Sequence, residues 1–131
     1  MSFFALSLRH ALIADAVISG AAALVMALGA GLLEGFLGVP AALLRYAGIV
    51  LIPFAVLVGY LGTRDRFPWA AVWAVITINA LWVAGSILLL ASGWIMPTAL
   101  GYTFIIVQAL AVGIFGELQY FGLRRLATSA A

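Results

Sequence analysis

Charged residues divide this sequence into long apolar stretches. Between residues 11 and 33 the only charge is Asp15, and residues 46–63 carry none. A third uncharged run, 67–116, is too long for one crossing, since about 20 apolar residues suffice for a helix to cross a bilayer. Residues 92–97 mark a turn within that run. The pattern therefore predicts four membrane-spanning segments, at about residues 11–33, 41–62, 69–91 and 98–121.

Continuous apolar runs favour helices, because a helix satisfies its own backbone hydrogen bonds in lipid. The alternation of apolar and polar residues that a membrane β-barrel needs is missing. The first run is longer than a secretory signal core, and Asp15 interrupts its start, so we expect an uncleaved first span. The predicted fold is all-α, with one integral membrane domain over residues 1–131, a four-transmembrane-helix bundle of two consecutive hairpins.

Composition supports this class and removes several functions. Hydrophobic residues make up 67% of the chain, against roughly half in a soluble domain. The absence of cysteine excludes disulfides, thiolate metal sites and cysteine nucleophiles. No phosphate loop, catalytic triad or metal-ligand spacing is visible, and the single histidine, His10, is expected to be an interfacial edge residue. We therefore expect no catalysis, no cofactor and no metal.

The arginines predict the orientation. Short loops that carry arginine stay on the cytoplasmic side. In a four-span arrangement five arginines fall at one end and one at the other, so both termini should be cytoplasmic. The net charge is only +2, and its location at span ends requires no nucleic-acid partner. Six arginines and no lysine in an alanine- and glycine-rich chain indicate a GC-rich bacterial genome, so we expect the protein in a bacterial inner (plasma) membrane. The five are Arg9, Arg64, Arg66, Arg124 and Arg125, against Arg45.

Two acidic residues lie within the predicted spans and are candidates for a site. Asp15 should be about 9 Å deeper than Arg9, and Glu117 about 10 Å deeper than Arg124, at 1.5 Å per residue. In one interpretation the two carboxyl groups face one cavity and share a proton. In the other they form structural ion pairs, Glu117 with Arg124 and Asp15 with the arginines at the same end.

Uncharged polar residues near mid-membrane form a second candidate group. Asn79 and Ser86 share one face of the third span with Trp82 beside them, and Gln108 lies near the middle of the fourth span, with Gln119 on the same side. Asn79 and Gln108 are expected to hydrogen-bond across helices, or else to form a substrate-contacting patch beside Trp82. The candidate polar site thus comprises Asp15, Asn79, Trp82, Ser86, Gln108 and Glu117.

Other features concern packing and turns. Glu34 and Arg45 flank the first turn, where a salt bridge would orient the hairpin at little gain in stability. The hairpins echo each other at an offset of 57 residues. This is either a parallel repeat of the kind found in some transporters or, as we favour, the similar dimensions of any two membrane hairpins. A ladder of small residues at four-residue steps should let the first span approach a neighbour closely. The ladder is Ser19, Ala23, Ala27 and Gly31.

The chain resembles the many small, uncharacterised four-span proteins of proteobacterial inner membranes. The resemblance covers most of the chain and implies no activity. It is also similar in outline to the small multidrug exporters, which have four short helices and a membrane acid in the first. This chain differs from them in its length and in having Asp where they have Glu, nearer the interface. The first resemblance is carried by Leu43-Leu44-Arg45, Asn79-Ala-Leu-Trp82, Pro97-Thr98 and the segment 119–125.

Two functions follow as hypotheses. The first is a non-enzymatic membrane protein that acts through helix packing, as a homo-oligomer or as an accessory subunit of a membrane complex. The second is a proton-coupled carrier or exporter of small lipophilic compounds that uses Asp15 and Glu117 as proton sites and Trp82 as a stacking surface. A polar cavity that reaches both acids would favour the carrier.

Overall fold

The computed structural model describes residues 3–129, and within that range the chain forms five helices joined by short turns, with no strand. Four of the helices are long and apolar enough to cross a membrane. The prediction of an all-α, multi-pass membrane fold is confirmed, and the second and third spans begin and end close to where the sequence placed them. The fourth begins as predicted but extends to Leu126 instead of ending near residue 121. The helices are α1 (Phe3–Leu28), α2 (Ala30–Leu37), α3 (Ala41–Gly62), α4 (Trp69–Ser92) and α5 (Ala99–Ser129).

The first span differs from its prediction. It was expected at residues 11–33, but the membrane-length helix runs over Leu6–Leu28, and residues 30–37 form the separate short helix α2. Gly29 separates the two, with φ −102° and ψ 14°. A larger residue would be obstructed there, because a Cβ on Gly29 would lie 2.8 Å from the carbonyl oxygen of Val25. Asp15 consequently lies about 14 Å along the span from Leu6, nearer the middle of the membrane than expected.

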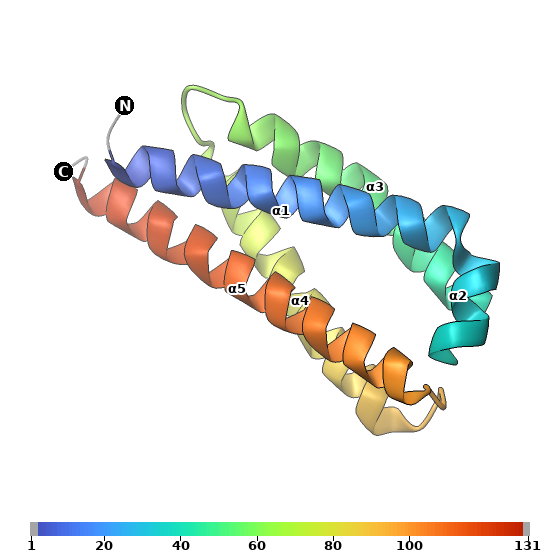
Figure 1. Ribbon diagram of the computed structural model, residues 1–131. Coiled ribbons are helices and arrows are strands. Elements are labelled where there is room, and N and C mark those ends of the chain that lie inside the picture. Colours follow the sequence, from blue (N-terminus) through green and yellow to red (C-terminus); the bar gives the residue numbers. More distant parts are fainter. Residues whose placement is uncertain (1–2, 130–131) are drawn as a thin grey trace.

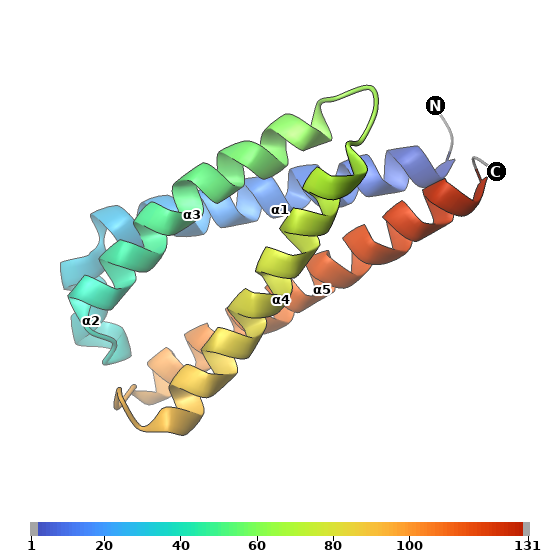
Figure 2. The same cartoon turned by 180° about the vertical axis from the view of Figure 1, so that it is seen from behind.

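The four long helices form two hairpins that converge at one end. Helix α1 packs along α3, α4 packs along α5, and α1 joins the hairpins by packing on α5 (Figure 1). Helices α3 and α4 are consecutive, yet they meet only near the loop that connects them and diverge away from it (Figure 2). The chain termini lie at the same end as that loop, so the arginine-rich segments gather there.

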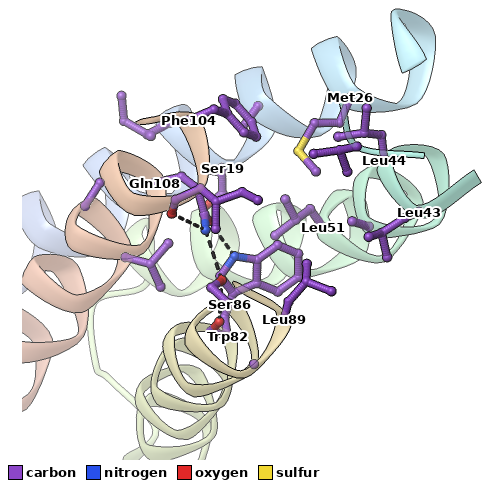
Figure 3. A pocket seen from close by; sticks show the side chains of 18 of the residues that line it. Ser19, Met26, Leu43, Leu44, Leu51, Trp82, Ser86, Leu89, Phe104 and Gln108 are labelled. Carbon is purple, nitrogen blue, oxygen red and sulfur yellow. Dashed lines mark hydrogen bonds between the residues drawn. The ribbon is translucent and has the colours of Figure 1, made fainter. Parts of the chain in front are cut away.

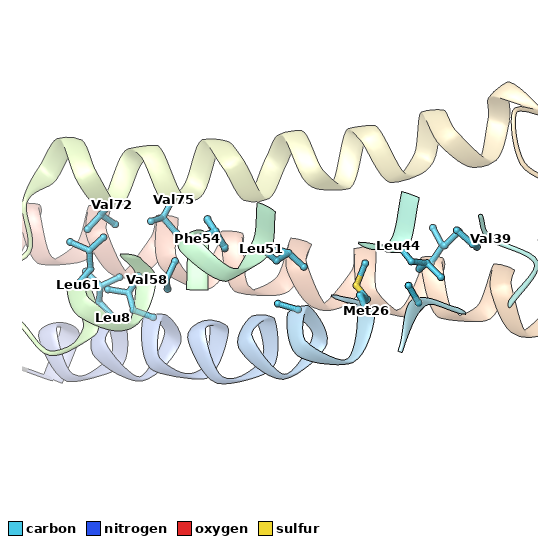
Figure 4. Packing of buried hydrophobic residues seen from close by; sticks show 14 of the residues in the cluster. Leu8, Met26, Val39, Leu44, Leu51, Phe54, Val58, Leu61, Val72 and Val75 are labelled. Atoms are coloured by element: carbon cyan, nitrogen blue, oxygen red, sulfur yellow. The ribbon is translucent and has the colours of Figure 1, made fainter. Parts of the chain in front are cut away.

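The burial of residues along α4 reflects the divergence of α3 and α4. Its buried residues are Val72, Val75 and Asn79, all in the first half of the helix. Val72 and Val75 pack with apolar residues of α1 and α3, Leu8 and Leu61 among them (Figure 4). Beyond Asn79 every residue of α4 is at least partly exposed. The bundle is therefore closed at the end near the termini and open between α3 and α4 at the other end.

A close contact between small residues holds α1 against α3. A Cβ placed on Gly48 would lie 2.7 Å from the backbone nitrogen of Ala27 and 2.8 Å from the carbonyl oxygen of Ala23. Ala23 and Ala27 belong to the small-residue ladder predicted for the first span, so the ladder packs within the bundle at this point. Close backbone approach of this kind drives helix association in lipid.

Replacing Gly48 with alanine should therefore force α1 and α3 apart, since the obstructing atoms are backbone. We expect Gly48→Ala to destabilise the protein by about 1–3 kcal/mol, the usual range for overpacking. Gly20→Ala is the matched control in the same interface, because its new Cβ would meet the Cβ of Ala55 at an ordinary 3.8 Å. The free energy of unfolding in a detergent titration checks this, and equal stability of the two variants would contradict the packing described.

Candidate functional site

A fully buried carboxyl group lies at the point where the two hairpins meet. Asp15 of α1 has no exposed surface, and its hydrogen-bond partners are three uncharged side chains. Ser19 Oγ donates to Asp15 Oδ1 at 2.9 Å, Asn79 Nδ2 of α4 donates to Oδ2 at 3.1 Å, and Gln119 Nε2 of α5 donates to Oδ2 at 2.7 Å. We call these four residues the Asp15 network.

The network is closed on itself. Asn79 Nδ2 also donates to Gln119 Oε1 at 2.9 Å, so both amides are engaged with each other as well as with the acid. An ionised carboxylate is an acceptor only, and here both of its oxygens receive donors. A buried polar group is costly unless it is hydrogen-bonded. The network thus satisfies its members while it joins α1, α4 and α5.

Arginine does not pair with Asp15, contrary to one interpretation of the sequence. Arg9 Nη2 donates to the carbonyl oxygen of Arg64 at 2.7 Å, and the guanidinium lies 5.6 Å from the centroid of the Phe67 ring. Arg9 Nε is buried and has no hydrogen-bond partner. Arg9 therefore connects the N-terminal part of α1 to the loop between α3 and α4. Its guanidinium binds the carbonyl oxygen of Arg64 and not the carboxyl group of Asp15.

Glu117 does not share a cavity with Asp15, contrary to the other interpretation. Glu117 is exposed, whereas Gln119 two residues later is fully buried. Positions two apart on an α-helix lie about 160° from each other, so only one of them can face the bundle. The sequence signal for Gln119 was its spacing of eleven residues from Gln108, which places both on one face. The amide is the partner of the acid because a neutral donor satisfies a carboxylate without a second charge.

A second polar group lies on the facing surfaces of α4 and α5. Trp82 Nε1 donates to Gln108 Oε1 at 2.6 Å, and Gln108 Nε2 donates to Ser86 Oγ at 3.0 Å and to the carbonyl oxygen of Ile105 at 2.9 Å (Figure 3). Ser86 Oγ in turn donates to the carbonyl oxygen of Trp82 at 2.8 Å. The expected Asn79–Gln108 hydrogen bond is therefore wrong, because each amide finds partners at its own depth.

This second group forms part of the wall of a cavity of about 470 Å³. All four long helices contribute to the lining, which is apolar apart from Ser19, Trp82, Ser86 and Gln108. The volume falls within the range of about 300–1,000 Å³ that is typical of small-molecule sites. Ser19 lines the cavity and also donates to Asp15, so it connects the cavity with the Asp15 network. Of the six predicted site residues, Trp82, Ser86 and Gln108 line the cavity.

The remaining predicted polar residues lie elsewhere. The Oε2 of Glu34 accepts a hydrogen bond from the backbone N–H of Ala41, the first residue of α3. The N-cap residue itself, Pro40, makes no such side-chain hydrogen bond. Arg45 is exposed and forms no ion pair with Glu34 in the part of the chain that the structure describes. The expected salt bridge is therefore replaced by a cap. His10 is exposed at the edge of a groove between α1 and α5, and residues 3–129 hold no cluster of three metal-ligating side chains.

The Asp15 network predicts a large difference between the two intramembrane acids. Asp15→Asn keeps the shape of the side chain but replaces one carboxylate oxygen with an amide nitrogen. That nitrogen cannot accept the hydrogen bond that the oxygen accepts in the unsubstituted protein. We expect it to destabilise the protein by about 1–3 kcal/mol, the cost of leaving buried polar groups unpaired. The control Glu117→Gln, at an exposed position, should change stability by less than about 0.5 kcal/mol.

Unfolding in a detergent titration measures both variants. Equal stability of Asp15→Asn and the unsubstituted protein would contradict the description, because it would mean that the network does not depend on two acceptor oxygens at this position.

Comparison with protein families, with curated proteins and with solved structures finds no match to this chain. What the fold establishes is a multi-pass membrane protein with four membrane-length helices. The cavity between its hairpins and the Asp15 network beneath that cavity are the features from which a function can be argued.

Proposed function

We propose that this is a non-enzymatic integral membrane protein that binds a lipophilic small molecule in the cavity between its two hairpins. The observation that carries the proposal is the cavity itself, with an apolar lining that the polar side chains of Trp82, Ser86 and Gln108 interrupt on one wall. Such a combination is typical of small-molecule sites, where apolar surface provides affinity and a few polar groups fix orientation. The indole, hydroxyl and amide on this wall neither gain nor lose a proton readily near neutral pH. The site is therefore suited to binding a ligand and not to acid–base catalysis.

The cavity can be reached from the lipid. Its opening lies where α3 and α4 diverge, and both are membrane-length helices. Residues of α4 that line the cavity, such as Leu81, are largely exposed at that opening (65%). A ligand dissolved in the bilayer therefore enters sideways without crossing a polar surface. The proposal places the protein in a bacterial inner membrane with both termini cytoplasmic, supported by the five arginines at one end.

A proton-coupled carrier is a second candidate, and one observation favours it. Ser19 is one of the residues that line the cavity, and its hydroxyl donates to Asp15, so a single residue separates the acid from the cavity. In this version Asp15 alone is the proton site, because Glu117 is exposed away from the cavity. Asp15→Asn would then abolish proton-linked flux in proteoliposomes and leave ligand binding intact, which separates the carrier from a binding protein.

Filling the cavity provides the direct test of the proposal. Gly85 lines the cavity, and a Cβ built on it meets nothing within 4 Å, so the backbone accepts a side chain there and Gly85→Leu adds bulk at the cavity wall. Gly31→Leu is the matched control on α2, where a Cβ also meets open space but does not line the cavity. We expect solvent extraction and mass spectrometry to recover a stoichiometric lipophilic molecule from the unsubstituted protein and from Gly31→Leu. At least tenfold less should come from Gly85→Leu.

Other occupants of the opening would give other results. If Gly85→Leu leaves the extracted molecule unchanged, the cavity is not its site and the proposal fails. If instead Gly85→Leu converts a dimer or a larger complex into a monomer, measured by light scattering in detergent, a second copy or a partner helix occupies the opening. The protein then acts through helix packing, as a homo-oligomer or accessory subunit.

A further inference from the structure

The hydrogen-bond donors on the wall of the cavity are all in use. Trp82 has one N–H, which Gln108 accepts, and Ser86 has one O–H, which the backbone of α4 accepts. The two hydrogens of the Gln108 amide are directed to Ser86 and to the carbonyl of Ile105. Ser19 donates its hydrogen to Asp15. No side-chain donor that lines the cavity is left for a ligand.

Acceptor capacity, in contrast, remains. An amide oxygen and a hydroxyl oxygen each have two acceptor positions. Gln108 Oε1 uses one for Trp82, and Ser86 Oγ uses one for Gln108. Both residues are only partly buried and line the cavity. The polar wall thus offers acceptors to whatever occupies the cavity.

Trp82 fixes this polarity. The orientation of an amide is normally uncertain, because its oxygen and nitrogen have nearly the same shape. An indole nitrogen is a donor only, so the reversed amide of Gln108 would place N–H against N–H at 2.6 Å. The oxygen of Gln108 must therefore face Trp82, and its nitrogen must face Ser86 and the α5 backbone. Trp82 consequently acts as the positioning residue for the Gln108 acceptor.

We infer that the cavity selects lipophilic molecules whose polar end donates a hydrogen bond, namely alcohols and phenols, over ketones, quinones and ethers of the same size. This inference rests on the proposed function, since it names the chemical class of the ligand. An acceptor-only molecule would bring its oxygen against the oxygens of Gln108 and Ser86, and neither group would gain a hydrogen bond. An alcohol donates to one of these oxygens, in a site where water is scarce.

The test uses 2-undecanol and 2-undecanone, which share one carbon skeleton and differ in whether the oxygen carries a hydrogen. The full-length protein is reconstituted in nanodiscs, and binding is measured by equilibrium dialysis, with Gly85→Leu nanodiscs subtracted to remove partitioning into lipid. We expect the alcohol to bind about three to ten times more tightly than the ketone, the equivalent of one net hydrogen bond. Trp82→Phe should reduce this ratio to near one, because the Gln108 amide is then free to turn over. Trp94→Phe, at a largely exposed tryptophan outside the cavity, should preserve it.

The outcomes separate this inference from the function on which it rests. Equal binding of the two probes to the unsubstituted protein, or tighter binding of the ketone, overturns the inference while the binding function stands. Binding of neither probe above the Gly85→Leu background counts against both the binding function and the inference. The comparison of 2-undecanol with 2-undecanone in the unsubstituted protein tests the selectivity even if Trp82→Phe does not fold. A ratio that survives in a folded Trp82→Phe also overturns the role given to Trp82.

Discussion

The need to satisfy a carboxyl group within the membrane determines how this molecule is assembled. Asp15 has no exposed surface, and no cation pairs with it among the described residues, so it must collect donors from its neighbours. Two of these, Asn79 and Gln119, come from α4 and α5, and they connect the first hairpin to the second within the membrane. At the opposite end Thr98 makes two further hydrogen bonds between the hairpins, to the carbonyl oxygens of Phe36 and Leu37. Polar interactions across membrane helices are individually modest. Their effect here is geometric, because they fix the depth and rotation at which three helices meet.

The cavity follows from the same constraint. Asn79 is the last buried residue of α4, and the next residues on its inner face, Trp82 and Ser86, belong to the wall of the cavity. On one side of Asn79 the helices are held together by the network and by Leu8, Val72 and Val75. On the other side α4 keeps its contact with α5 through Gln108 but leaves α3. The Asp15 network therefore marks the level at which the closed half of the bundle ends and the open half begins.

The internal residues could be predicted from the sequence more accurately than the contacts between them. Uninterrupted apolar runs gave the spans, and helical periodicity placed Asn79, Trp82, Ser86 and Gln108 on inward faces, as the structure has them. Periodicity specifies a face of one helix but not the neighbouring helix or its depth, so the pairing of Asn79 with Gln108 was wrong. Glu117 was a candidate because of its charge. The residue that donates a hydrogen bond to Asp15 is instead Gln119, two positions later. The break at Gly29 was missed because apolarity continues through it, and the close approach of Gly29 to the Val25 carbonyl oxygen is visible only in the structure.

The position of the cavity along the bundle limits where its ligand comes from. Its lining includes Met26, Val39 and Leu44, which lie toward α2, at the end opposite the chain termini. The arginine-rich segments lie at the other end, near the loop between α3 and α4, and arginine in short loops favours the cytoplasmic side. In the orientation proposed above, the cavity would lie in the outer half of the bilayer, and the closed half of the bundle would separate it from the cytoplasm. The proposed ligand would then exchange with the outer leaflet, and only a change in the packing around the Asp15 network would give it a path inward.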